Sequence, residues 1–163
     1  LSRLLADDEA RVSIGSNHIR VTGADYCFTS KLVDGSYPDY DRVVPKGGNK
    51  LVVGDREQLK QAFGRTAILS NEKYRGVTIQ LVNGAMHLAA NNPEQEEAQE
   101  EVSVAYSGDS LEIGFNVSYL LDVLNVLKSK EIRFTLADSN SSALVEDASG
   151  ASKATYVVMP MRL

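Results

Sequence analysis

Residue types that carry covalent or metal chemistry are scarce in this sequence. Its 163 residues include one cysteine and two histidines. The single cysteine, Cys27, excludes an internal disulfide and is typical of a protein from a reducing compartment. Because Cys27 lies in a stretch that predicts a strand, we expect it to be a small core residue and not a nucleophile. His18 and His87 fall in separate predicted strands, and we expect both at the strand surface.

Other signatures of catalysis and of membrane insertion are missing as well. No glycine-rich phosphate loop precedes either predicted helix, and the acidic stretch lacks the spacing and central glycine of a calcium loop. No window approaches the ~20 uninterrupted apolar residues of a membrane-spanning helix. We therefore expect no enzyme, no metal site, no cofactor and no membrane partner.

Negative charge is concentrated in one stretch. Residues 94–101 hold five carboxylates and no cation, which equals the whole formal net charge of −5. A negative net charge by itself argues against a generic nucleic-acid binder. Two interpretations of the stretch stay open at this point. It is either a solvated edge that keeps strands from pairing wrongly or a docking surface for a basic partner.

Hydrophobic periodicity first predicts three antiparallel strands, at residues 11–14, 18–22 and 26–33. Residues 1–5 resemble the end of a helix whose start is absent, so we expect a fragment of a longer protein. Turn-forming residues 34–48 predict a linker that proline keeps extended and fairly stiff. We place a domain boundary near residue 41.

The rest of the chain contains an internal repeat, in which Gly54 and Gly114 fall at matching places, 60 residues apart. Each unit predicts a strand, a helix and three further strands. The first unit comprises a strand at 50–53, a helix from Asp55 to about Leu69, and strands at 75–82, 85–90 and 101–106. The second comprises a strand at 110–114, a helix at 115–128, and strands at 131–137, 143–147 and 154–158.

Two such units predict an α+β fold in which two helices pack on antiparallel sheets. Repeated units related by a fixed rotation form arcs or rings. Asp55 is a plausible N-cap of the first helix. The buried face of that helix is predicted by residues at helical spacing: Leu59, Ala62, Phe63 and Thr66.

Three cations on the first helix, Arg56, Lys60 and Arg65, can project from its other sides. Such faces are most often merely solvated. If several repeats turned the same helix face toward one place, a ring could present a positive lining to DNA phosphates. Contacts of that kind would be independent of DNA sequence.

The last eight residues are apolar almost to the end of the sequence. Tyr156 to Val158 predict a strand, and Pro160 ends it because proline has no N–H for a sheet ladder. Met159 and Met161 flank the proline, and soft, unbranched methionine suits a surface that must mould to a guest. The stretch is either a last strand that finishes in the core or an apolar pocket for a partner's side chains.

Five long stretches of the sequence closely resemble the bacterial beta sliding clamps, the beta subunits of DNA polymerase III. They are FTSKLVDGSYPDY (28–40), AILSNEKYRG (67–76), ANNPEQEE (90–97), IGFNVSYLLDVL (113–124) and YVVMPMRL (156–163). The similarity covers essentially all 163 residues. It implies the DNA-clamp fold, with the end of the middle domain in residues 1–40 and the complete C-terminal domain in residues 41–163.

The resemblance also implies a function without catalysis. Members of the family are DNA polymerase processivity factors, ring-shaped homodimers that encircle duplex DNA. They are cytoplasmic and associated with the nucleoid. Clamp-binding peptides of the polymerase III alpha subunit, the clamp-loader delta subunit, other polymerases and mismatch-repair proteins dock in a pocket between the middle and C-terminal domains. The alternative for this chain is an isolated peptide-binding module that does not encircle DNA, because the chain is a fragment.

The family's functional positions carry over residue by residue, which favours the pocket at the chain end and the docking interpretation of the acidic stretch. Peptide-pocket positions are Pro38, Arg42, Val43, Tyr74, Asn116, Tyr119, Ser142, Val157, Val158, Met159, Pro160, Met161 and Arg162. Subunit-interface positions are Ile68, Leu69, Glu94, Glu96, Glu97 and Glu100. The expected DNA-facing cations are Arg56, Lys60 and Arg65.

Overall fold

Two units make up the computed structural model, residues 1–38 and 39–163, and the structure describes residues 9–37 and 39–162. The first unit contains three antiparallel strands in the order β1-β2-β3. Their bounds are Arg11–Ile14, His18–Thr22 and Cys27–Lys31. These are the three strands that the alternating pattern predicts. The predicted helix end at residues 1–5 lies outside the described residues.

Cys27 is exposed on β3, so the expectation of a core position is wrong. Val21 is the one buried apolar side chain among residues 9–37. A single three-stranded sheet has no second layer within this part of the chain, so an apolar strand residue is not buried by being in the strand. His18 is exposed at the start of β2, as predicted.

The predicted extended linker contains a one-turn helix, α1 (Tyr40–Val43), so that prediction is wrong over these residues. The Asp39 side chain accepts a hydrogen bond from the Asp41 backbone N at 3.1 Å and caps the turn. Short aspartate side chains bond to nearby backbone N–H groups in this way, and so favour helix starts.

The second unit is built from two repeats of strand, helix and three strands, as predicted. The first repeat comprises β4 (Lys50–Asp55), α2 (Arg56–Ile68), β5 (Gly76–Val82), β6 (Ala85–Asn91) and β7 (Glu97–Ser103). The second comprises β8 (Leu111–Asn116), α3 (Val117–Val126), β9 (Glu131–Leu136), β10 (Ala143–Asp147) and β11 (Thr155–Val158).

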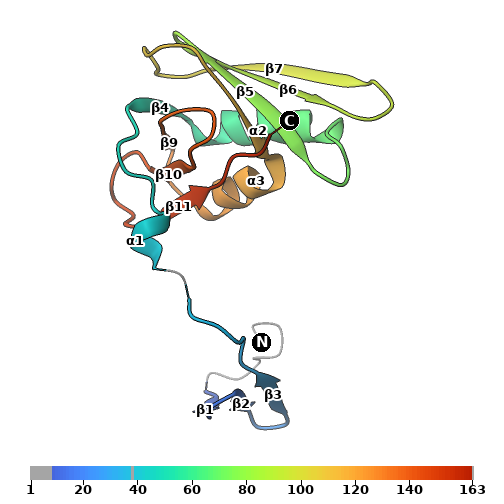
Figure 1. Ribbon diagram of the computed structural model, residues 1–163, viewed down its shortest axis with the longest axis vertical. Helices are drawn as coiled ribbons and strands as arrows, with labels where there is room; N and C mark the ends of the chain where they lie inside the picture. Colours follow the sequence, from blue (N-terminus) through green and yellow to red (C-terminus); the bar gives the residue numbers. More distant parts are fainter. Residues whose placement is uncertain (1–8, 38, 163) are drawn as a thin grey trace. The chain divides into compact units, whose positions relative to one another are not determined.

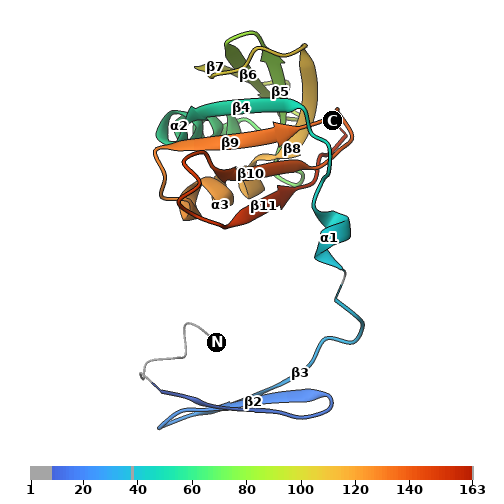
Figure 2. The ribbon, with the colours of Figure 1, turned by 90° about the vertical axis from the view of Figure 1, so that its left-hand side faces the viewer.

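The two repeats exchange their opening strands. Strand β4 of the first repeat pairs antiparallel with β9 of the second, and β8 of the second pairs antiparallel with β5 of the first. The resulting sheets have the orders β11-β10-β9-β4 and β7-β6-β5-β8. Figure 2 shows the first of these sheets with its four strands side by side. Neither repeat can therefore complete its sheet without the other.

Helices α2 and α3 pack against each other and against the sheets, with α2 beneath β5, β6 and β7 in Figure 1. The predicted buried face of α2 is confirmed, since its four side chains are at most 1% exposed: Leu59, Ala62, Phe63 and Thr66. Side chains of both repeats form one hydrophobic cluster. No helix in the described parts of the chain is long and apolar enough to cross a membrane.

The segment that follows each repeat's last strand returns to that repeat's opening strand. Val53 on β4 exchanges two backbone hydrogen bonds with Ala105, at 3.1 and 2.7 Å. In the second repeat, the Met161 backbone N donates to the Gly114 carbonyl on β8 at 2.9 Å. The end of the chain is thereby held against the sheet that contains β8.

Strand β7 begins at Glu97, four residues before the predicted strand, and ends at Ser103. The prediction for this strand is wrong because the turn after β6 is short. Gln95 adopts a left-handed φ of 65°, and the Asn92 backbone N donates to the Glu96 carbonyl at 3.2 Å. Most of the acidic stretch therefore lies on an edge strand, where successive side chains point to opposite faces.

Asp147 organises the loop between β10 and β11. Asp147 is buried. Its carboxylate accepts hydrogen bonds from the Ser149 backbone N at 2.8 Å, the Ser149 Oγ at 2.7 Å and the Ser152 backbone N at 3.1 Å. The hydrogen bonds from Ser149 are the main reason that the pKa of Asp147 lies below its usual value. The carboxylate thus helps to set the path of the chain into β11.

We predict that Asp147→Asn lowers stability at neutral pH and that this loss shrinks in acid. An unfolded aspartate has a pKa of ~3.9. Because the folded pKa is lower, the stabilising contribution is complete above the unfolded pKa and is lost as pH falls through the folded pKa. Urea unfolding at pH 7 and at steps below about pH 4 measures the difference. A difference that is constant with pH would contradict the prediction, and Asp122→Asn on α3 is the control.

Candidate functional site

A hollow of about 330 Å³ lies where the chain end meets the sheet β7-β6-β5-β8. Its lining comes from the turn after α2, from β5 and β6, and from the chain end: Asn71, Tyr74, Gly76, Thr78, Ala89, Ala90, Asn91, Met161 and Arg162. Of the predicted peptide-pocket residues, Tyr74, Met161 and Arg162 are brought together here. The Met161–Gly114 link places the last two in this position.

Tyr74 is presented by a tightly bonded turn. The Asn71 side chain accepts from the backbone N of Lys73 at 2.9 Å and of Tyr74 at 3.0 Å. The next residue, Arg75, adopts a left-handed φ of 51°, and its Nη1 donates to the Ala67 carbonyl at the end of α2, at 3.1 Å. Tyr74 is 55% exposed as a residue and lines the hollow, so its side chain can offer apolar surface there.

Asn116 connects this turn to the start of α3. Its Oδ1 accepts from the Ser118 backbone N at 2.9 Å, which caps the helix, and its Nδ2 donates to the Tyr74 carbonyl at 3.1 Å. The Val117 backbone N also donates to the Arg75 carbonyl at 2.8 Å. The Asn116 amide therefore links the turn that carries Tyr74 to the first turn of α3.

The other predicted peptide-pocket residues do not line this hollow. Val157 and Val158 lie on β11, where they pair with Leu144 and Ala143 of β10, and Val158 is buried. Exposed positions are those of Tyr119 on α3, Met159 after β11, and Arg42 and Val43 on α1. Ser142 and Pro160 are half-buried. Pro38 lies outside the described residues.

Sequence reasoning missed the floor of the hollow, which consists of small residues such as Gly76, Thr78 and Ala89. Small side chains form no recognisable motif. The available signal is the period of two in the β5–β6 hairpin, which places these residues on one face. Thr78 pairs with Ala89, and Gly76 belongs to the same face two residues earlier.

Four of the six predicted interface residues line a second hollow, of about 510 Å³. Ile68 and Leu69 at the end of α2 line it together with Glu94 and Glu96 from the turn before β7. Ile68 is 75% exposed. Glu97 lies on β7 outside this lining. The arrangement places an uncovered apolar residue beside carboxylates.

The three predicted DNA-facing cations do not form one group. The Arg56 side chain is mostly buried, and it donates from Nε to the Ser129 carbonyl at 3.0 Å and from Nη1 to the Leu124 carbonyl at 3.2 Å. Arg65 binds Glu100 on β7 through two hydrogen bonds, at 2.5 and 2.9 Å. Lys60 is half-buried and forms no ion pair with any residue that the structure describes.

The Arg65–Glu100 pair determines the charge on one side of β7. The hydrogen bonds from Arg65 lower the pKa of Glu100, and the same bonds raise the pKa of Arg65. Glu100 is therefore engaged within the domain.

In residues 9–37 and 39–162, no three histidine, cysteine, aspartate or glutamate side chains are grouped as a metal site would require.

Two β-α-β-β-β repeats with exchanged opening strands, and two helices packed on two antiparallel sheets, define a clamp-fold protein. The family model of the DNA polymerase III beta subunit, C-terminal domain, matches residues 41–162. The chain therefore belongs to the DNA polymerase III beta subunit family, the bacterial beta sliding clamps.

Individual relatives agree with this assignment. The beta sliding clamp of Pseudomonas aeruginosa strain PAO1 is 64% identical over 165 residues, covering 100% of this chain and 45% of its own length. That of Escherichia coli strain K12 is 56% identical with the same coverage. The chain spans 45% of the length of these curated relatives.

Solved structures give the same result at the level of the fold. The crystal structure of the DNA polymerase III subunit beta from Pseudomonas aeruginosa has a TM-score of 0.85 at 62% identity, over 99% of this chain and 45% of that one. The sliding clamp of Bartonella birtlesii bound to griselimycin has a TM-score of 0.84 at 35% identity, over 99% and 44%. The predicted clamp fold is confirmed.

We predict that the two functions of Asn116 can be separated. Asn116→Ala removes the helix cap and should lower the free energy of unfolding by about 1 kcal/mol. Asn116→Asp keeps an oxygen for the Ser118 N–H but loses the donor to the Tyr74 carbonyl. It should keep most of the stability and increase amide hydrogen exchange in residues 71–75, measured by mass spectrometry. Equal exchange in the wild type and Asn116→Asp would contradict the prediction.

We predict that Arg56 contributes to folding and Lys60 does not. Arg56→Ala removes a charged donor from two carbonyl groups and should lower the free energy of unfolding by about 1–3 kcal/mol. Lys60→Ala should change it by less than about 0.5 kcal/mol, as is usual for surface substitutions. Urea denaturation measures both, with Arg56→Lys as the variant that keeps charge without the guanidinium fork. Equal losses for Arg56→Ala and Lys60→Ala would overturn this prediction.

Proposed function

We propose that this chain is part of a DNA polymerase processivity factor. Such a factor is a non-enzymatic sliding clamp that tethers partner proteins to duplex DNA through a peptide-binding pocket. The observation that carries the proposal is the hollow in which Tyr74 and Met161 meet, in a domain that belongs to the beta clamp family. We further propose the domain division given above, with the end of the middle domain before residue 41.

The chemistry of the hollow suits a short peptide with leucine and phenylalanine side chains. Tyr74 and Met161 supply apolar surface at its edge, and Gly76 and Ala89 leave room above the sheet. Asn71 and Arg162 supply polar groups that can set the direction of a peptide backbone. Val157, Val158, Met159 and Pro160 do not line this hollow and are proposed to extend the pocket along the chain end. Arg42, Val43, Asn116, Tyr119 and Ser142 are proposed as its further contacts.

The partners follow from the family. We infer that the pocket takes clamp-binding peptides of the polymerase III alpha subunit, the clamp-loader delta subunit, other polymerases and mismatch-repair proteins. The sliding clamp of Pseudomonas aeruginosa has been solved bound to griselimycin, at 62% identity and a TM-score of 0.81 over 99% of this chain and 44% of that one. That structure supports a ligand site on a close relative of this chain.

The ring function rests on two further surfaces. The uncovered Ile68 and the carboxylates beside it suit a basic surface of a second subunit, in a head-to-tail homodimer. DNA phosphates would contact the helices of the ring without regard to sequence. Of the three helix cations, Lys60 has no ion pair with any described residue and can make such a contact, whereas Arg56 and Arg65 already bind groups within the domain. A cytoplasmic, nucleoid-associated location follows from this role.

The alternative is a peptide-binding module without DNA encirclement. The same hollow supports it, because peptide docking needs the pocket and not the ring. Retention on closed circular DNA after loading distinguishes the two, since only a closed ring remains on DNA that has no ends.

The proposal predicts saturable binding of a labelled Gln-Leu-x-Leu-Phe peptide to this chain, measured by fluorescence anisotropy. Met161→Ala removes an apolar wall of the hollow and should weaken binding about tenfold or more, as truncation of a central contact residue does. Val126→Ala, at an exposed apolar position outside the hollow, is the matched control and should bind like the wild type. Binding that Met161→Ala leaves unchanged would refute the pocket.

A further inference from the structure

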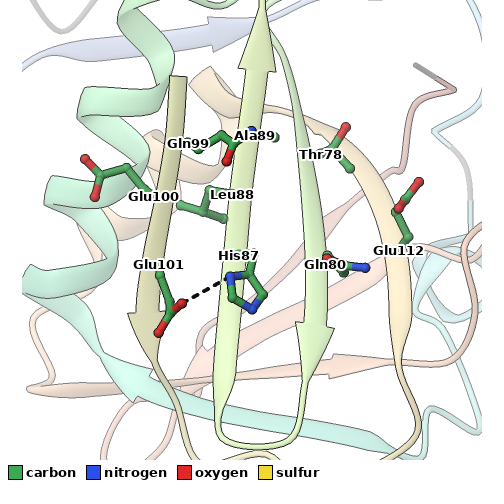
Figure 3. A pocket seen from close by; sticks show the side chains of 9 residues that line it. All are labelled: Thr78, Gln80, His87, Leu88, Ala89, Gln99, Glu100, Glu101 and Glu112. Atoms are coloured by element: carbon green, nitrogen blue, oxygen red, sulfur yellow. Dashed lines mark ion pairs between the residues drawn. The ribbon is translucent and has the colours of Figure 1, made fainter. Parts of the chain in front are cut away.

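The outer face of the sheet β7-β6-β5-β8 carries a polar row that crosses all four strands. Strand register places Glu112 opposite Gln80, Gln80 opposite His87, and His87 opposite Glu101. Figure 3 shows these side chains next to one another across the sheet. They line a hollow of about 460 Å³. No predicted functional residue belongs to this row.

This hollow adjoins the one at the chain end. Thr78 and Ala89, a directly paired couple on β5 and β6, line both hollows. Their small side chains lie between the polar row and the part of the first hollow that Tyr74 and Met161 line, and they leave the sheet surface there unobstructed. Rows of same-face residues on a strand are about 7 Å apart, so about two residues of extended peptide span this step. A peptide seated at Met161 can therefore reach the row with its own flank.

The charge of the row defines what it can take. Glu101 and Glu112 are exposed, and neither has a lysine or arginine ion partner within residues 9–37 and 39–162. Within the row, the Glu101 Oε2 lies 3.4 Å from the His87 Nδ1. The neighbouring Glu100 faces α2 and is neutralised by Arg65, so it does not contribute.

We propose that this row extends the peptide pocket and takes lysine or arginine side chains from the segment that flanks a docked peptide. The inference rests on the proposed function, because it presupposes a peptide at Met161. The two carboxylates stand at opposite ends of the row with polar side chains between them, so one flank with two basic residues can reach both. Such exposed ion pairs act over short range and are weakened by salt.

The test compares three peptides that share the Gln-Leu-x-Leu-Phe core. One has serine flanks, one has two lysines before the core, and one has two lysines after it. At low ionic strength, one of the lysine peptides should bind about three- to tenfold tighter than the serine peptide, and salt should reduce this gain. In Glu101→Gln/Glu112→Gln the gain should disappear, while the affinity for the serine peptide stays the same.

A matched variant excludes an effect of net charge alone. Asp122→Asn/Glu131→Gln changes the charge by the same amount at exposed positions on α3 and β9, and it should keep the gain. The extension is overturned if neither flank increases affinity, if the gain survives in Glu101→Gln/Glu112→Gln, or if the matched variant removes it too. If the serine peptide also fails to bind, the pocket itself is refuted. If that peptide binds in a Met161-dependent way without any gain from lysine, only the extension is.

Discussion

The exchange of opening strands between the two repeats is the constraint on which this domain depends. Because β4 completes the second repeat's sheet and β8 completes the first repeat's, each hydrophobic face is buried only when both repeats are present. The two helices are then held between shared sheets, and one core serves both repeats.

The same repetition explains why a site forms at the chain end. After β7 the chain returns to β4 through Val53 and Ala105, and after β11 it returns to β8 through Gly114 and Met161. The first return continues into the next repeat, whereas the second brings the last described residues to the β8 edge of the sheet, where Met161 and Arg162 line the hollow. There Met161 meets the Tyr74 turn, which Asn71, Arg75 and Asn116 hold by hydrogen bonds. A pocket wall thus arises from the closure of the fold.

Strand alternation divides the acidic stretch into different roles. Glu100 faces α2 and is paired with Arg65, whereas Glu101 faces outward beside His87. Glu94 and Glu96 precede the strand and lie with the exposed Ile68. Carboxylates that are neighbours in the sequence therefore have different roles. Glu100 belongs to an ion pair within the domain, Glu101 belongs to the polar row, and Glu94 and Glu96 belong to the candidate interface. This is why net charge alone was a poor guide to their use.

The sequence by itself determined the repeat, the helix faces and the chemistry of the chain end, because these depend on local periodicity and residue type. Leu59 and Phe63 at helical spacing and the Asp55 cap both follow from neighbours along the chain. Only the tertiary structure decided which strands pair, that Cys27 is exposed, and that Arg56 and Arg65 are engaged. These depend on contacts between residues far apart in the chain, for which spacing carries no signal. The residues of the pocket differ in the same way. Met161 was recognisable in the sequence by its residue type, whereas Thr78 and Ala89 became recognisable only once the sheet had brought them to the same hollow.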